Sequence, residues 1–124
     1  MFSLHNSRAF LLLLLVVFGL SSSINSQTIT YNYHFCLDQS NKTANTNYKS
    51  NLTVLLDSLS TKASQNYSLY NESSNIGIYG LFLCRGDVSN NTCQRCVSYA
   101  TQNITTRCPS HETAIIWYDE CMLR

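Results

Sequence analysis

The chain has 124 residues, which is the usual length of one domain. After the N-terminal segment described next is set aside, the remaining 98 residues carry seven basic and seven acidic side chains, scattered along the chain. Such a balance provides no basic stripe for a phosphate backbone, so neither nucleic acid nor another acidic polymer is an expected partner.

The first segment in chain order has the pattern of a secretory signal peptide. A short start with one basic residue, Arg8, precedes an unbroken apolar run over residues 9–20 and small polar residues over 21–26. The alternative is a membrane anchor, but this run has 12 residues, whereas a spanning helix needs about 20. We therefore predict a signal peptide over residues 1–26, cleaved after Ser26 or else after Ser23, and a mature domain over 27–124 without a membrane segment.

The first half of the mature chain predicts a strand and a helix. Residues 28–35 alternate apolar and polar side chains and predict a strand that ends at Cys36. A polar loop over 38–47 and a helix over about 47–64, with Asn47 or Thr46 as its N-cap, come next. Residues 64–75 are polar, with one short alternation from Tyr67 to Leu69. The expected apolar face of the helix consists of Tyr48, Leu52, Leu55, Leu56, Leu59 and Ala63.

The second half predicts a strand, a helix and a final strand. Residues 76–84 are rich in β-branched and aromatic side chains, and glycines at 77 and 80 could bulge or bend this strand. Residues 85–87 spell Arg-Gly-Asp, which we interpret as turn chemistry. A helix capped by Ser89, Asn90 or Asn91 then runs to the stop at 108–109, and residues 113–122 form the last strand. The helix carries Cys93, Cys96, Val97, Ala100 and Ile104 on one side.

This order of elements predicts an α+β fold, with two helices packed on one face of an antiparallel sheet. A domain of about 100 residues has a thin margin of stability. All six cysteines lie in the mature part, and a secretory route would oxidise such an even set to three disulfides. The sequence by itself leaves their pairing open. The cysteines are Cys36, Cys84, Cys93, Cys96, Cys108 and Cys121.

The pair Cys93-x2-Cys96 has alternative interpretations as half of a zinc site or as a redox dithiol. Export to an oxidising compartment favours structural disulfides instead. The chain also carries six acceptor motifs for N-linked glycans, which mark exposed positions if they are used. The acceptors are Asn41, Asn51, Asn66, Asn71, Asn90 and Asn103.

A few side chains are candidates for catalysis or binding. His34 and His111 adjoin no nucleophile motif, and Asp119 and Glu120, if on a strand, would point to opposite faces. We therefore predict that the domain is no enzyme and holds no metal or cofactor. We expect Trp117 in the core. Better candidates for an aromatic sugar-binding platform are Tyr31, Tyr33, Tyr67 and Tyr70.

One motif is specific enough to indicate a family. The spacing Cys84-x8-Cys93-x2-Cys96 resembles the plant ginkbilobin-homologous domain, also called the salt-stress-response/antifungal domain. This domain occurs in cysteine-rich repeat secretory proteins and in the ectodomains of cysteine-rich receptor-like kinases, and the resemblance covers roughly residues 28–124. Further matching segments are Tyr79-Gly80, Leu83-Cys84-Arg85-Gly86-Asp87, Cys93-Gln94-Arg95-Cys96, Cys108-Pro109 and residues 114–119 before Cys121.

The resemblance implies the disulfide pairing and a class of function. The implied pairs are Cys36 with Cys108, Cys84 with Cys93 and Cys96 with Cys121. The implied function is a secreted binding module of the antifungal or carbohydrate-binding type, acting in defence or stress response in the apoplast. Its partner would be an extracellular carbohydrate or protein.

The chain departs from the family's mannose contacts. Two of these contact positions correspond to Leu37 and Ile115, which lack the polar groups that hold sugar hydroxyls, and the third lies beyond Arg124. We therefore assign no ligand-binding residue. The alternative functions are a truncated ectodomain of a cysteine-rich receptor-like kinase, acting by protein contact, and, more remotely, a dithiol redox protein.

Overall fold

The computed structural model describes residues 8–9, 12–13 and 28–124. The predicted signal peptide over residues 1–26 and its cleavage points lie almost wholly outside this set. Within the described parts of the chain, no helix has both the length and the apolar character needed to cross a membrane.

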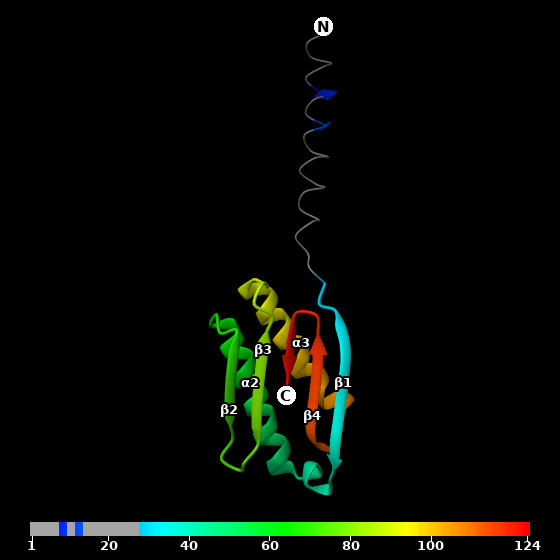
Figure 1. Ribbon diagram of the computed structural model, residues 1–124, viewed down its shortest axis with the longest axis vertical. Coiled ribbons are helices and arrows are strands. Elements are labelled where there is room, and N and C mark those ends of the chain that lie inside the picture. Colours follow the sequence, from blue (N-terminus) through cyan, green and yellow to red (C-terminus); the bar gives the residue numbers. More distant parts are fainter. Residues whose placement is uncertain (1–7, 10–11, 14–27) are drawn as a thin grey trace.

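Over residues 28–124 two α-helices cover one face of a five-stranded antiparallel sheet (Figure 1). The strands lie in the order β1-β4-β5-β3-β2. The predicted α+β class, with both helices on one face and three disulfides, is therefore confirmed. The elements are β1 (Tyr31–Gln39), the 3-10 helix η1 (Asn41–Ala44), α2 (Thr46–Ser64), β2 (Leu69–Ser73), β3 (Tyr79–Cys84), α3 (Asn90–Arg107), β4 (His111–Tyr118) and β5 (Cys121–Leu123).

The strand β1 starts three residues later than predicted and ends beyond its predicted end at Cys36. It begins at Tyr31 and passes through Cys36 to Gln39, because β4 offers partners along its whole length, from Tyr118 to His111. The predicted final strand over 113–122 is instead a hairpin. β4 and β5 are separated by a tight turn at 119–120, and the predicted position of these two acidic residues on a strand was wrong.

The strand β2 was missed, since its sequence is polar and lies in a segment predicted as loop. It forms because β3 pairs with all five of its residues, from Leu69 opposite Leu83 to Ser73 opposite Tyr79. The predicted strand over 76–84 starts only at Tyr79, because residues 74–78 make the turn between the two strands. Gly77 in this turn has a φ of +86°, a backbone conformation that favours glycine.

The N-cap of the helix α2 lies one or two residues before the predicted caps, Thr46 and Asn47. Asn45 is the N-cap, and its side chain accepts a hydrogen bond from the backbone N–H of Asn47 at 2.8 Å. The helix buries Leu55, Leu59 and Ala63, which form one stripe of the predicted apolar face.

The helix α3 follows its prediction closely. Ser89, one of the three expected caps, accepts a hydrogen bond from the backbone N–H of Thr92 at 3.1 Å. Cys108 ends the helix as its C-cap. The five residues predicted to share a side are all buried: Cys93, Cys96, Val97, Ala100 and Ile104.

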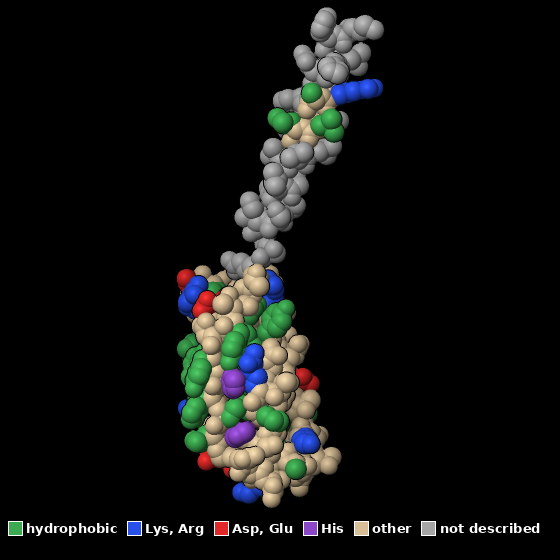
Figure 2. Space-filling view, turned by 90° about the vertical axis from the view of Figure 1, so that its right-hand side faces the viewer, with side chains coloured by type: hydrophobic (Ala, Val, Ile, Leu, Met, Phe, Trp, Pro, Cys, Tyr) green, Lys and Arg blue, Asp and Glu red, His purple; other side chains and the backbone are tan. Residues whose placement is uncertain are grey.

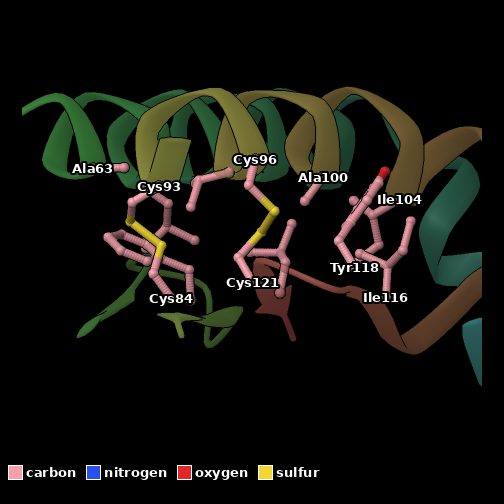
Figure 3. Close-up of a cluster of buried hydrophobic side chains, with 13 residues drawn as sticks. Ala63, Cys84, Cys93, Cys96, Ala100, Ile104, Ile116, Tyr118 and Cys121 are labelled. Atoms are coloured by element: carbon pink, nitrogen blue, oxygen red, sulfur yellow. A yellow bond between two sulfur atoms is a disulfide. The ribbon is translucent and has the colours of Figure 1, made fainter. Parts of the chain in front are cut away.

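The core lies between the helices and the covered face of the sheet (Figure 3). Phe82, Ile116 and Leu123 come from three strands and are almost wholly buried against the helical stripes. Gly80 lets α2 approach the sheet closely, because a Cβ built there would lie 2.7 Å from Cδ1 of Leu59. The glycine thus serves helix packing, and the predicted bulge or bend is not needed to explain it.

Disulfides join Cys36 to Cys108, Cys84 to Cys93 and Cys96 to Cys121. These are the pairs that the family resemblance implies. Figure 3 shows two of them linking α3 to the sheet. All six cysteines are used, and Cys93 and Cys96 bond to different partners instead of to each other. This pairing leaves no Cys-x2-Cys dithiol for the remote redox alternative.

Candidate functional site

The face of the sheet that the helices leave uncovered is the candidate functional site. Side chains alternate between the two faces along each strand. Because Phe82, Ile116 and Leu123 point toward the helices, their strand neighbours point to solvent. We call this surface the open face; it consists of Tyr33, Phe35, Leu37, Leu69, Asn71, Ser73, Tyr79, Leu81, Leu83, Thr113, Ile115, Trp117 and Met122.

One line of apolar residues crosses the open face from edge to edge. Directly opposed pairs connect each strand to the next, with one residue contributed by every strand. Cross-strand neighbours on one face lie about 4.5–5.5 Å apart between Cβ atoms, so the side chains form a continuous surface. We call this line the apolar row; it runs through Tyr33, Trp117, Met122, Leu83 and Leu69.

The apolar row is accessible to solvent. Tyr33 is 58% exposed, Leu69 at the opposite edge 55%, and Leu83 between them 44%. In Figure 2, which looks at the domain from the β1 side, hydrophobic side chains gather in a column along the left margin, where the open face lies. Single exposed hydrophobic residues are ordinary on protein surfaces, but a contiguous band of them marks an interaction site.

Trp117 lies on the open face and not in the core, so its predicted position was wrong. It is half-buried and stacks on Tyr33, with ring centroids 5.8 Å apart and an angle of 29° between the ring planes. The flanking residues Ile116 and Tyr118 take the buried positions instead. Both sides of β4 are apolar, and alternation alone could not show which side the helices cover.

The four candidate tyrosines do not form one platform. Only Tyr33 lies on the open face; Tyr31 stands at the helix side of β1, with the Arg107 guanidinium 3.8 Å from its ring centroid. Tyr67 and Tyr70 contact each other edge to face at 5.2 Å, beside Lys62. The predicted aromatic platform is therefore reduced to Tyr33 with Trp117.

The open face also contains the positions that the resemblance implies for sugar contacts. Leu37 on β1 and Ile115 on β4 both point outward there, close together because Ile115 opposes Phe35, two residues before Leu37. Leu37 is exposed and Ile115 is half-buried. Neither side chain donates or accepts a hydrogen bond, so this part of the face offers contact area and no sugar-specific polar groups.

His34, Asp119 and Glu120 each form a hydrogen bond with a residue at or just before the start of β1. His34 Nδ1 lies 2.5 Å from the hydroxyl of Tyr31, and His111 Nδ1 is buried. Asp119 accepts a hydrogen bond from the side chain of Asn32 at 2.7 Å, and Glu120 accepts one from the backbone N–H of Thr30 at 3.1 Å. The turn therefore anchors the chain entering β1. Among the described residues there is no cluster of three or more His, Cys, Asp or Glu that could hold a metal.

The two charged side chains of the Arg-Gly-Asp tripeptide bond to each other. The guanidinium of Arg85 donates a hydrogen bond to the carboxylate of Asp87 and a second, at 3.1 Å, to the backbone oxygen of Asp119. The first bond lowers the pKa of Asp87 and raises the pKa of Arg85. Since the two charged ends are paired with each other, the geometry supports the interpretation as a turn.

A cleft of about 460 Å³ lies beside the N-terminal end of α2, and its lining includes Tyr79 and Thr113 of the open face. Its rim includes Tyr48, Arg124 and the pair Lys42 and Glu112, whose nitrogen and oxygen are 3.9 Å apart. Burial and the negative charge of Glu112 raise the pKa of Tyr48. A second pocket, which shares Tyr48 and Ala114 with this cleft, lies between α2 and the sheet next to Leu55.

Sequence analysis missed the open face as a site, although a signal for it was present. A solvated antiparallel strand alternates apolar and polar residues, whereas residues 114–118 are apolar on both sides. The segment Leu81–Leu83 shows the same double apolarity, with Phe82 between two outward leucines. Such strands indicate either a second covering layer or a binding face.

Comparisons with known proteins agree with this fold. Residues 35–124 match the family described as "Salt stress response/antifungal". The chain is 43% identical over 129 residues to cysteine-rich repeat secretory protein 1 of Arabidopsis thaliana, covering 100% of this chain and 37% of that protein. It is 45% identical over 94 residues to an antimicrobial ginkbilobin-2-like protein of Castanea crenata, covering 74% and 39% respectively.

The receptor-like relatives are much longer than this chain. Cysteine-rich receptor-like protein kinase 25 of Arabidopsis thaliana is 42% identical over 101 residues, which cover 77% of this chain and 15% of the kinase. The crystal structure of the tandem DUF26 ectodomain of the Arabidopsis thaliana cysteine-rich receptor-like protein PDLP8 superposes with a TM-score of 0.70 at 25% identity. The alignment covers 78% of this chain and 48% of that one.

Proposed function

This chain belongs to the salt stress response/antifungal family, and we propose that it is an extracellular binding module that contacts a protein ligand through the open face of its sheet. The observation that carries this proposal is the apolar row, which spans all five strands, with Tyr33, Leu83 and Leu69 exposed and Trp117 and Met122 half-buried. Apolar surface of this extent gains free energy when a partner removes it from water.

The chemistry of the open face favours a protein over a sugar. The central parts of protein interfaces are enriched in aromatic residues and methionine, and Trp117, Tyr33 and Met122 lie side by side here. Tryptophan and tyrosine are also the residues that most often dominate binding energy. A sugar site needs precisely placed polar groups, and the implied contact positions Leu37 and Ile115 supply none.

Three observations support an extracellular location. Two of the relatives named above are a secretory protein and a receptor-like kinase. The three disulfides suit an oxidising compartment. Residues 1–26 have the pattern of a signal peptide, so we propose that the mature module, residues 27–124, is secreted to the apoplast and acts in defence or stress response.

Two other functions are alternatives to a secreted module that binds a protein. In the first, the module is part of a receptor-like kinase ectodomain, where the open face would serve the same contact role. In the second, it binds carbohydrate, the ligand class that the family resemblance implies. The stacked rings of Tyr33 and Trp117 favour this second setting, because aromatic rings present apolar faces on which sugars can stack.

The test is a binding screen of the secreted protein against two panels in parallel. One panel holds plant extracellular protein domains, and the other holds fungal and plant cell-wall glycans. The open-face variant combines Tyr33→Ser with Leu37→Ser, both at exposed positions. The matched control is Tyr99→Ser, which removes an exposed tyrosine from the outer surface of α3.

We expect a protein ligand whose affinity falls about tenfold or more in the open-face variant, because hot-spot truncations cost about 2 kcal/mol. The control should bind as the parent does. Binding to glycans alone would favour the carbohydrate setting. An equal loss of affinity in the control and the open-face variant would overturn the proposal.

A further inference from the structure

One glycan acceptor lies on the open face. Asn71 is exposed on β2 and opposes Leu81 on β3, and its neighbours on the same face of its own strand are Leu69 and Ser73. The alternate residues of this strand, Tyr70 and Glu72, are half-buried, and Tyr70 packs against the core. The side chain of Asn71 therefore points to the same solvent as the apolar row.

The other five acceptors lie off this face. Two belong to helices on the covered side and are half-buried, with their side-chain nitrogens already donating hydrogen bonds. Asn51 donates to the backbone oxygen of Asn47 at 2.8 Å, and Asn103 donates to the hydroxyl of Tyr118 at 3.1 Å. The remaining three occupy η1, the turn after α2 and the first position of α3: Asn41, Asn66 and Asn90.

The position of Asn71 divides the open face into two halves. Its Cβ lies about 5 Å from that of Leu81 and about 7–8 Å from that of the diagonal neighbour Leu83. Tyr33 stands on β1, four strands away, which is about 19 Å at the spacing of paired strands. A bulky group on Asn71 would therefore cover the leucines of β2 and β3 and leave the Tyr33–Trp117 pair open.

A bulky group on Asn71 would also shield the exposed edge of the sheet at β2. β2 is an edge strand, so one side of its backbone has no strand partner among the described residues. Exposed edges next to apolar side chains invite pairing with other chains, and proteins block them with charged or bulky features. Over the described residues of β2 the one charged side chain, Glu72, is half-buried on the helix side.

We infer that an N-linked glycan on Asn71 covers the β2–β3 half of the open face and confines the protein ligand to the β1–β4 half. In forming it, Nδ2 of Asn71 loses a proton and bonds to the anomeric carbon of an oligosaccharide. The bond from that carbon to a lipid pyrophosphate breaks, and the pyrophosphate leaves. The inference rests on the proposed function, since it assumes passage through the secretory route and a binding role for the face.

The test compares three proteins secreted from a eukaryotic host. Ser73→Ala removes the acceptor motif without changing Asn71, and its side chain is exposed. Ser68→Ala removes the neighbouring motif at Asn66, so it also loses one acceptor, but away from the open face. Peptide mass spectrometry reports occupancy of Asn71, and hydroxyl-radical footprinting reports the exposure of individual side chains without any ligand.

We expect Asn71 to be glycosylated in the parent protein. Oxidation of Leu69 and Leu83 should rise severalfold in Ser73→Ala and in parent protein treated with peptide-N-glycosidase. The enzyme-treated parent keeps the test valid if the Ser73→Ala variant folds poorly. Oxidation of Tyr33 and Trp117 should not change, and Ser68→Ala should match the parent at all four residues.

An unmodified Asn71 in the secreted protein would overturn the inference, and so would equal oxidation of Leu69 and Leu83 with and without the glycan. These readouts need no ligand, so they separate the two proposals. A shielded β2–β3 half together with a failed binding screen would leave the glycan's position standing and remove the proposed function.

Discussion

Tyr33 and Trp117 lie opposite each other on β1 and β4 and stack with ring centroids 5.8 Å apart, at the β1 edge of the surface that the helices do not cover. Trp117 is the single tryptophan of the chain. Its fluorescence therefore reports directly on the open face.

Tyr33→Ala should expose Trp117 without unfolding the domain. We expect a red-shifted emission maximum and stronger quenching by acrylamide, because the ring loses the partner that shields one of its faces. The free energy of unfolding should fall by only about 0.5–1 kcal/mol, the usual value for a cross-strand aromatic pair. Tyr99→Ala on α3 serves as the control and should leave the emission unchanged. An unchanged emission in Tyr33→Ala would contradict the stacked geometry.

Gly80→Ala should destabilise the domain. The new Cβ would meet Cδ1 of the buried Leu59 at 2.7 Å and Cδ2 of Leu55 at 3.3 Å, so these side chains or α2 itself must move away from the sheet. Overpacking of this kind costs about 1–3 kcal/mol, which urea denaturation followed by circular dichroism would measure. Gly86→Ala is the matched control, since no atom lies within 4 Å of a Cβ there. Equal stability of the two variants would show that α2 does not pack as described.

Mild reduction of the native protein should open Cys36–Cys108 before Cys96–Cys121. Cys36 is half-buried on the edge strand, whereas Cys96 and Cys121 are almost wholly buried in the core. Thiol–disulfide exchange requires access to a sulfur atom, so the order follows exposure. Brief treatment with a reductant, alkylation and mass spectrometry would give the order. In strong denaturant, where access is equal, the order should disappear.

Loss of Cys36–Cys108 should weaken the fold more than its exposed position suggests. The bond joins residues 72 positions apart in the chain. In the chain-entropy treatment a loop of that length contributes up to about 4.4 kcal/mol by restricting the unfolded state. The species reduced at this bond alone should therefore unfold at a clearly lower urea concentration. An unchanged midpoint would contradict this.

Tyr48→Phe should reduce alkaline destabilisation. The pKa of Tyr48 in the folded state is raised above its ordinary value of 10.0 by burial and by Glu112, so the folded protein holds the phenolic proton more tightly than the unfolded chain. At pH values below the ordinary pKa, Tyr48 therefore does not affect the free energy of unfolding. As the pH rises from the ordinary pKa to the raised pKa of the folded state, the free energy of unfolding falls. Urea denaturation at pH 9 and pH 11 would show a smaller drop for the variant. An equal drop in the parent and the variant would show that groups other than Tyr48 cause the alkaline destabilisation.

The two helices were the elements that the sequence predicted best. Residues such as Leu55, Leu59, Val97 and Ala100 repeat at helical spacing, so the buried stripe can be predicted without knowledge of its partner. The cap at Ser89 is equally local, since it bonds within its own first turn. The family resemblance, which the comparisons confirm, depended on cysteine spacing and neighbouring motifs in the same way.

The strands were predicted less well, because strand formation depends on partners far along the chain. The polar segment Leu69–Ser73 becomes a strand only where β3 pairs with it. The turn at 119–120 divides the last predicted strand, and its acidic side chains bond to residues at the start of β1. No local pattern indicates such contacts between residues 87 or more positions apart.

Spacing within short segments is enough to predict the two helices, the set of cysteines, the class of fold and the family. Which side of each strand faces the helices depends instead on packing between distant parts of the chain. Ile115, Ile116, Trp117 and Tyr118 are all apolar, so their alternation defines two faces but does not show which one is covered. The helices settle this by packing on the side of Ile116 and Tyr118, and the other side remains as the open face on which the proposed binding depends.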